Sequence, residues 1–148
     1  MDELDLQVFI DGTTDFFAQM GGEKADVGTP YLVSNCNSEI KGFTGIIGVS
    51  GKRRGSVYFT APPVLLKVLL MSIGEEDTSH ENLCDMVGEV ANVISGSARK
   101  EFGQDFLISV PVVVVGRLDK IVVPAELRSF VVPISWKSYD AALVISLE

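Results

Sequence analysis

The chain is poor in the residues that build metal and redox sites. Its 148 residues include one histidine and two cysteines. Cys36 and Cys84 lie far apart and form no Cys-x-x-Cys pair, which favours two idle thiols over a disulfide or a metal site. His80 is the single histidine of the chain, so no second histidine can join it in a metal site. We therefore expect no metal ligated by this chain.

Positive charge and long apolar runs are also scarce. Twelve Lys and Arg against 20 Asp and Glu give a net charge of −8, which disfavours nucleic acid and anionic membranes as partners. The longest apolar stretch in a helix-like segment, Val64–Ile73, contains Lys67 and is far shorter than the roughly 20 residues of a membrane helix. The start of the chain, Met1-Asp2-Glu3, is acidic where an export signal would be basic. These features predict a cytoplasmic protein without membrane insertion.

The overall composition of the chain is typical of a globular protein, with 47% apolar and 22% charged residues. We expect residues 1–148 to form one domain. Amphipathic spacing predicts a first helix from Leu6 to Met20, ended by Gly21-Gly22. Prolines at 62 and 63 open a second helix that ends at Gly74. Thr78-x-x-Glu81 is typical of a capping box and predicts a third helix that runs to about Phe102.

Most of the other apolar segments are typical of β-strands. Glycines in the turn 50–55 favour a hairpin of its two neighbouring strands. The expected extended segments are Thr29–Val33, Phe43–Val49, Ser56–Thr60, Phe106–Val115, Ile121–Val123, Phe130–Trp136 and Ala141–Leu147. This order predicts an α/β (α+β) domain in which three helices pack on a largely antiparallel sheet of about six strands.

The third predicted helix has one apolar and one polar side. On a wheel of about 100° per residue, an apolar stripe surrounds Leu83, and a polar ridge lies between about 180° and 240° from it. The ridge consists of Asp85, Glu89, Asn92 and Gly96, bordered by Gly88. Glycine costs about 1 kcal/mol in a helix interior, so Gly88 and Gly96 suggest the close approach of another surface. Periodicity alone also fits a merely solvated face.

The pattern Asp85-x3-Glu89-x2-Asn92, with Pro111 further on, resembles the signature of the CheC, CheX and FliY family of chemotaxis phosphatases. The resemblance extends over about residues 5–148 and includes Phe43–Gly51, Gly55–Thr60, Asn92–Arg99 and Ile108–Gly116. CheC-type members have two Glu-x2-Asn helices, whereas this chain has one. FliY-type members add a motor-binding segment, which we do not expect in this chain. The resemblance is therefore greatest to CheX.

The resemblance implies a phosphatase that hydrolyses the aspartyl phosphate of a CheY-like response regulator. Asn92 would orient the attacking water, and Glu89 would pair with the active-site lysine of the regulator. Asp85, Gly88 and Gly96 would help to bind the partner. The chain would need no cofactor of its own, because the regulator supplies Mg²⁺.

Two other functions stay open at this stage. A CheX-like module without activity could dock a regulator or a signalling complex, and a structural component of the flagellar switch is a weaker third possibility. The retained Glu89 and Asn92 favour the enzyme. The resemblance also implies a homodimer joined through the sheet. Phe106–Val115 and Phe130–Leu147 support it, since they supply more strand-forming residues than a small sheet easily hides.

Overall fold

The computed structural model describes residues 2–33, 42–116 and 129–148. These residues form three helices and eight strands. In chain order the elements are α1 (Glu3–Gly21), β1 (Asp26–Val27), β2 (Tyr31–Val33), β3 (Phe43–Gly51), β4 (Gly55–Ala61), α2 (Pro63–Ser72), α3 (His80–Phe102), β5 (Phe106–Ile108), β6 (Val112–Val115), β7 (Ser129–Trp136) and β8 (Tyr139–Leu147). Within the described ranges, no helix is long and apolar enough to span a membrane.

The three predicted helices are confirmed, with one change at a cap. Helix α1 begins with a capping box between Asp2 and Asp5 and ends at Gly22, whose φ of 76° is the left-handed conformation that favours glycine. Helix α3 is capped by Ser79, not by Thr78 as predicted. The Ser79 hydroxyl accepts a hydrogen bond from the Asn82 amide at 3.4 Å. Serine and threonine both favour the cap position, and in the structure Ser79, one residue after the predicted cap, makes the capping bond.

The strands differ from the prediction in number and in bounds. Strand β1 lies in a segment expected to be a loop, and its two residues pair with β7. The single run expected over Phe106–Val115 is divided into β5 and β6. Residues 109–111 separate the two, because Pro111 has no N–H to donate and the Ser109 hydroxyl accepts from the Gly48 amide at 2.8 Å. The segment Ile121–Val123 lies outside the described residues.

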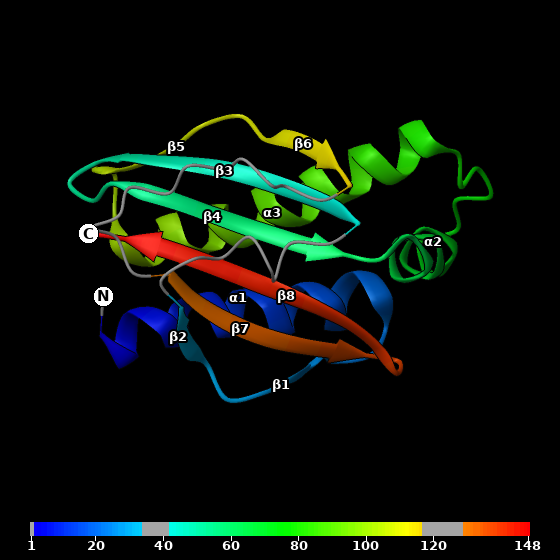
Figure 1. Ribbon diagram of the computed structural model, residues 1–148, viewed down its shortest axis with the longest axis horizontal. Coiled ribbons are helices and arrows are strands. Elements are labelled where there is room, and N and C mark those ends of the chain that lie inside the picture. The colour runs from blue at the N-terminus through cyan, green and yellow to red at the C-terminus, as the bar shows by residue number, and fades with distance from the viewer. Residues whose placement is uncertain (1, 34–41, 117–128) are drawn as a thin grey trace.

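All strands belong to one sheet, with the order β1-β7-β8-β4-β3-β5. Strand β2 also pairs with β7, and β6 also pairs with β3. Every one of these pairings is antiparallel. Figure 1 shows the resulting sheet, with β8 between β4 and β7. The predicted class, helices on a largely antiparallel sheet, is confirmed.

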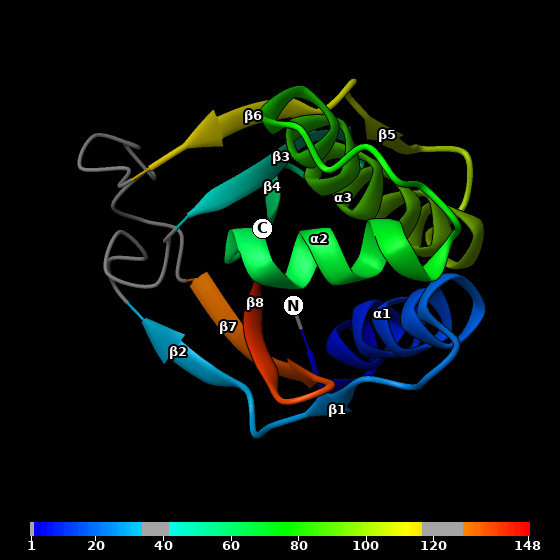
Figure 2. The same cartoon turned by 90° about the vertical axis from the view of Figure 1, so that its right-hand side faces the viewer.

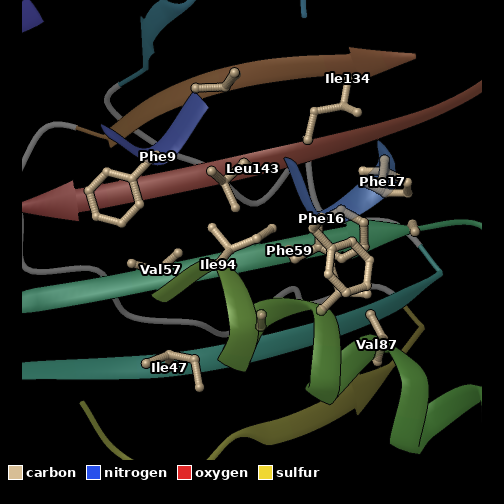
Figure 3. Close-up of a cluster of buried hydrophobic side chains, with 14 of the residues drawn as sticks. Phe9, Phe16, Phe17, Ile47, Val57, Phe59, Val87, Ile94, Ile134 and Leu143 are labelled. Carbon is tan, nitrogen blue, oxygen red and sulfur yellow. The ribbon is translucent and has the colours of Figure 1, made fainter. Parts of the chain in front are cut away.

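The core lies between the sheet and the helices that cover one of its faces. Figure 2 shows α1 and α3 on that face, with α2 across one end. Side chains from α1, α3 and four strands meet in the cluster of Figure 3, and all of them are buried. The labelled members are Phe9, Phe16, Phe17, Ile47, Val57, Phe59, Val87, Ile94, Ile134 and Leu143. This core supports the inner side of α3 over several turns.

Candidate functional site on helix α3

The apolar stripe predicted for α3 forms its inner side. Six residues that repeat at helical spacing are each at most 4% exposed: Leu83, Val87, Val90, Ala91, Ile94 and Ala98. They face the sheet and α1, so the helix is held along its length. Any side chain on the opposite side is therefore presented by a well-supported backbone.

Gly45 of β3 sets how closely α3 approaches the sheet. A Cβ atom at this position would lie 2.5 Å from the Val87 carbonyl oxygen and 3.1 Å from the Ala91 Cβ. Gly45 is not among the glycines with a positive φ, so its requirement is purely one of space. Sequence reasoning did not single out this residue, although a glycine inside a strand is a known signal of close backbone approach.

The predicted ridge residues lie on the outward side of α3. The side chains of Asp85 and Glu89 are exposed, and Asn92 and Gly96 are partly exposed. Glu89 and Asn92 are three residues apart, which places them about 4.5 Å apart along the helix axis and about 60° apart around it. Within the described part of the chain, neither side chain has a hydrogen-bond or ion-pair partner. Both are therefore available to a partner, and their roles stay predictions.

The two glycines of the predicted binding surface differ from each other. Gly88 is buried, and a Cβ there would lie 3.2 Å from Val113 and 3.5 Å from Pro111 of the same chain. The small size of Gly88 thus lets Pro111 and Val113 pack on α3. We had expected Gly88 to leave room for a partner, but this contact within the chain takes up that space. Gly96 is partly exposed and has no atom within 4 Å of such a Cβ among the described residues. Only Gly96 leaves open space on the ridge.

A groove that the sequence did not reveal lies beside the ridge, between the end of α2 and the first half of α3. The volume of this groove is about 280 Å³. The groove is lined by Leu70, Ile73, Glu75, Asn82, Asp85, Met86 and Glu89. Both carboxylates of the predicted ridge, Asp85 and Glu89, therefore also form one wall of a concave surface. Helical periodicity assigns faces within one helix but says nothing of how two helices meet.

Cys84 lies next to Asp85 and is partly buried. Burial, followed by the negative charge of Asp85, raises the pKa of the Cys84 thiol, so at neutral pH the thiol stays protonated. A protonated thiol is a poor nucleophile. Cys36, the other cysteine, lies outside the described residues. In the ranges that the structure describes, no three His, Cys, Asp or Glu residues are grouped to hold a metal ion.

Comparison with known protein families shows the family to which the chain belongs. The family model described as chemotaxis phosphatase CheX matches residues 43–135. This chain belongs to the CheX family. The match includes β3, β4, α2, α3 and the strands that follow to β7, and therefore the whole outward ridge of α3.

Solved structures agree with the membership in the CheX family. A CheC-like superfamily protein from Shewanella sp. PV-4 is 25% identical, with a TM-score of 0.87 over 100% of this chain and 99% of that chain. The chemotaxis protein CheX from Vibrio vulnificus is 25% identical, with a TM-score of 0.80 over 97% and 96%. The CheX–CheY–BeF₃–Mg²⁺ complex from Borrelia burgdorferi shares the fold at 22% identity, with a TM-score of 0.76 over 97% of both chains. A search of curated proteins gives no match.

Proposed function

We propose that this CheX-family chain accelerates hydrolysis of the aspartyl phosphate of a CheY-type response regulator. The observation that carries the proposal is the outward pair Glu89 and Asn92 on a helix whose other side is buried. The family is one of chemotaxis phosphatases. A CheX protein of the same fold forms a complex with CheY, BeF₃ and Mg²⁺. This complex supports a regulator as the partner.

In the proposed mechanism Asn92 orients the water that attacks phosphorus. Its amide can both donate and accept hydrogen bonds and does not titrate, so it acts by position and not as a base. Phosphoryl transfer depends chiefly on an in-line nucleophile and on stabilisation of the spread negative charge. We assign that charge stabilisation, including Mg²⁺, to the regulator. The role of α3 is then to hold the attacking water in line through Asn92, which lowers the entropic cost of reaching the transition state.

Glu89 is proposed to pair with the lysine of the regulator's active site. Its carboxylate is exposed, and it lies on the same outward side as Asn92. A charge-assisted hydrogen bond at this point would set the register of docking and thereby place Asn92 over the phosphoryl group. Asp85, one turn earlier, would extend the negative surface, and Gly96 would leave room for the partner.

The direct test is release of phosphate from the phosphorylated cognate regulator, with and without this protein. A small phosphodonor can load the regulator with Mg²⁺ present, and loss of the phosphoryl group is then followed in time. We expect a faster loss that rises with the concentration of the protein. Binding to the regulator without any acceleration would instead support a docking module without activity.

Glu89→Ala is expected to weaken docking as well as turnover, because it removes the proposed partner of the regulator's lysine. We expect Kd for the BeF₃-loaded regulator to rise about tenfold at low salt, with a smaller change at high salt, where exposed pairs are screened. Titration at two ionic strengths measures this effect. Glu101→Ala, an equal loss of charge three turns along α3, is the matched control. Equal affinities of wild type and Glu89→Ala at low salt would contradict the assigned role.

We also propose that the protein is a homodimer joined through its sheet. Phe130–Leu147 no longer supports this idea, since β7 and β8 lie inside the sheet. The support now comes from exposed apolar residues near the β5–β6 edge, Leu107, Val110, Val112 and Val115. An apolar sheet edge is a hazard that symmetric pairing removes.

Light scattering at micromolar concentration should give about twice the chain mass of 16.0 kDa. Val112→Lys is expected to shift the protein towards the monomer, since lysine at a sheet edge opposes pairing. Val64→Lys, at an exposed position of α2, is the matched control and should leave the mass unchanged. A wild-type monomer, or a dimer in which Asn92 is buried, would refute the proposal.

A further inference from the structure

The groove between α2 and α3 has an apolar base and an acidic rim. Leu70 and Met86 are 5% and 6% exposed and form the base, and Ile73, at 41% exposed, forms an apolar wall. The rim carries the exposed carboxylates of Glu75, Asp85 and Glu89, and the lining contains no Lys or Arg. Such a surface is complementary to an apolar side chain with a cation next to it.

The end of the groove is held by a series of hydrogen bonds in the connection between α2 and α3. The Glu75 amide donates to the Leu70 carbonyl at 2.9 Å, and the Glu75 carboxylate accepts from the Asp77 amide at 3.0 Å. The Asp77 carboxylate accepts from the Ser79 amide at 2.9 Å, and the Asp77 carbonyl accepts from the Asn82 side chain at 2.9 Å. The groove is thus already formed, so little ordering is needed when a partner binds.

The groove is continuous with the proposed catalytic face. Glu89 lines the groove and also stands three residues before Asn92 on α3. A regulator placed over Asn92 therefore covers the groove or passes along its rim. At a net charge of −8, the chain as a whole also favours a partner surface that carries positive charge.

We propose that this groove is a second contact site for the response regulator. Its occupant is a surface segment of the regulator in which a Lys or Arg lies beside an apolar side chain. The apolar side chain would rest on Leu70 and Met86, and the cation would lie among the rim carboxylates. The inference rests on the proposed function and adds a determinant of partner choice outside the reacting centre, since differences in this segment would discriminate one regulator from another.

Two variants test the groove without touching Asn92 or Glu89. Glu75→Gln removes a rim charge and keeps an oxygen that can accept from the Asp77 amide. Ile73→Ser removes the apolar wall at an exposed position. For each variant we expect KM for the phosphorylated regulator, and Kd for the regulator with BeF₃ and Mg²⁺, to rise three- to tenfold. At saturating regulator, kcat should stay within twofold of wild type, because the groove does not contact the phosphoryl group. The Glu75→Gln effect should decrease with salt, and the Ile73→Ser effect should not.

Asp26→Asn is the matched control, since it removes one exposed carboxylate from β1, far along the sheet from α3. It should leave KM and Kd unchanged. Unchanged KM and Kd in both groove variants, with an active wild type, would overturn the groove and leave the proposed function intact. If wild type binds the BeF₃-loaded regulator without accelerating hydrolysis, the phosphatase is refuted, and weaker binding by the variants still supports the groove. Absence of binding by wild type overturns both.

Discussion

Replacing Asn92 by alanine is expected to lower the acceleration of regulator dephosphorylation by about 10²-fold, which corresponds to about 2.7 kcal/mol of transition-state stabilisation. The reason is the loss of the hydrogen bonds that would hold the attacking water in line. Asn92 is partly exposed and lies opposite the buried stripe of α3, so its truncation leaves the core intact. Phosphate release at saturating regulator measures the effect.

The control for this prediction is Gln19→Ala, which removes an exposed amide from α1 and should not change the rate. Thermal melting of both variants should agree with wild type within about 2 °C. Affinity for the BeF₃-loaded regulator should change little in Asn92→Ala, because Glu89 is proposed to dominate docking. Near-full activity of a folded Asn92→Ala protein would show that the assigned mechanism is wrong.

Gly45→Ala is expected to destabilise the protein strongly at the contact between β3 and α3. The added Cβ would lie 2.5 Å from the Val87 carbonyl oxygen, and neither backbone can move without separating α3 from the sheet. We expect a loss of about 3 kcal/mol in the free energy of unfolding, or about 10 °C in Tm. Because α3 also carries Glu89 and Asn92, activity should fall even at temperatures at which the variant is folded. Denaturant unfolding and the phosphate-release assay together measure both effects.

Gly48→Ala, three residues along the same strand, is the matched control. A Cβ at Gly48 would meet the Ser109 hydroxyl at 3.5 Å, which is an ordinary contact. We therefore expect its stability to stay within about 1 kcal/mol of wild type. Equal stabilities of the two alanine variants would refute the assignment of Gly45 as the residue that sets the distance between helix and sheet.

The parts of the fold that local patterns encode could be predicted from the sequence. The outward position of Asp85, Glu89 and Asn92 follows from the 3.6-residue period of the apolar stripe alone. The ends of α1 at Gly22 and of the hairpin β3–β4 follow from glycine and turn chemistry. In each of these cases the determining contacts lie within a few residues of one another.

The parts that depend on contacts between distant segments could not be predicted. Strand β1 exists because its two residues pair with β7, which lies more than 100 positions further along the chain. Gly88 is buried because the segment at Pro111 packs on it, although its place on the helical wheel borders the polar side. The groove requires that α2 meet α3 at a particular position. No periodicity within one segment carries such information.

The position of β8 bears on how the protein forms during synthesis. This strand is made after all the others, yet it joins β7 to β4 through pairs such as Phe130–Ile145 and Val57–Ile145. Until it has left the ribosome, the described strands can form only two separate half-sheets, β1-β2-β7 and β4-β3-β5-β6, each with an open edge. The nascent chain would then need shielding from aggregation by chaperones. From this topology we expect the two halves of the sheet to join only after β8 becomes available.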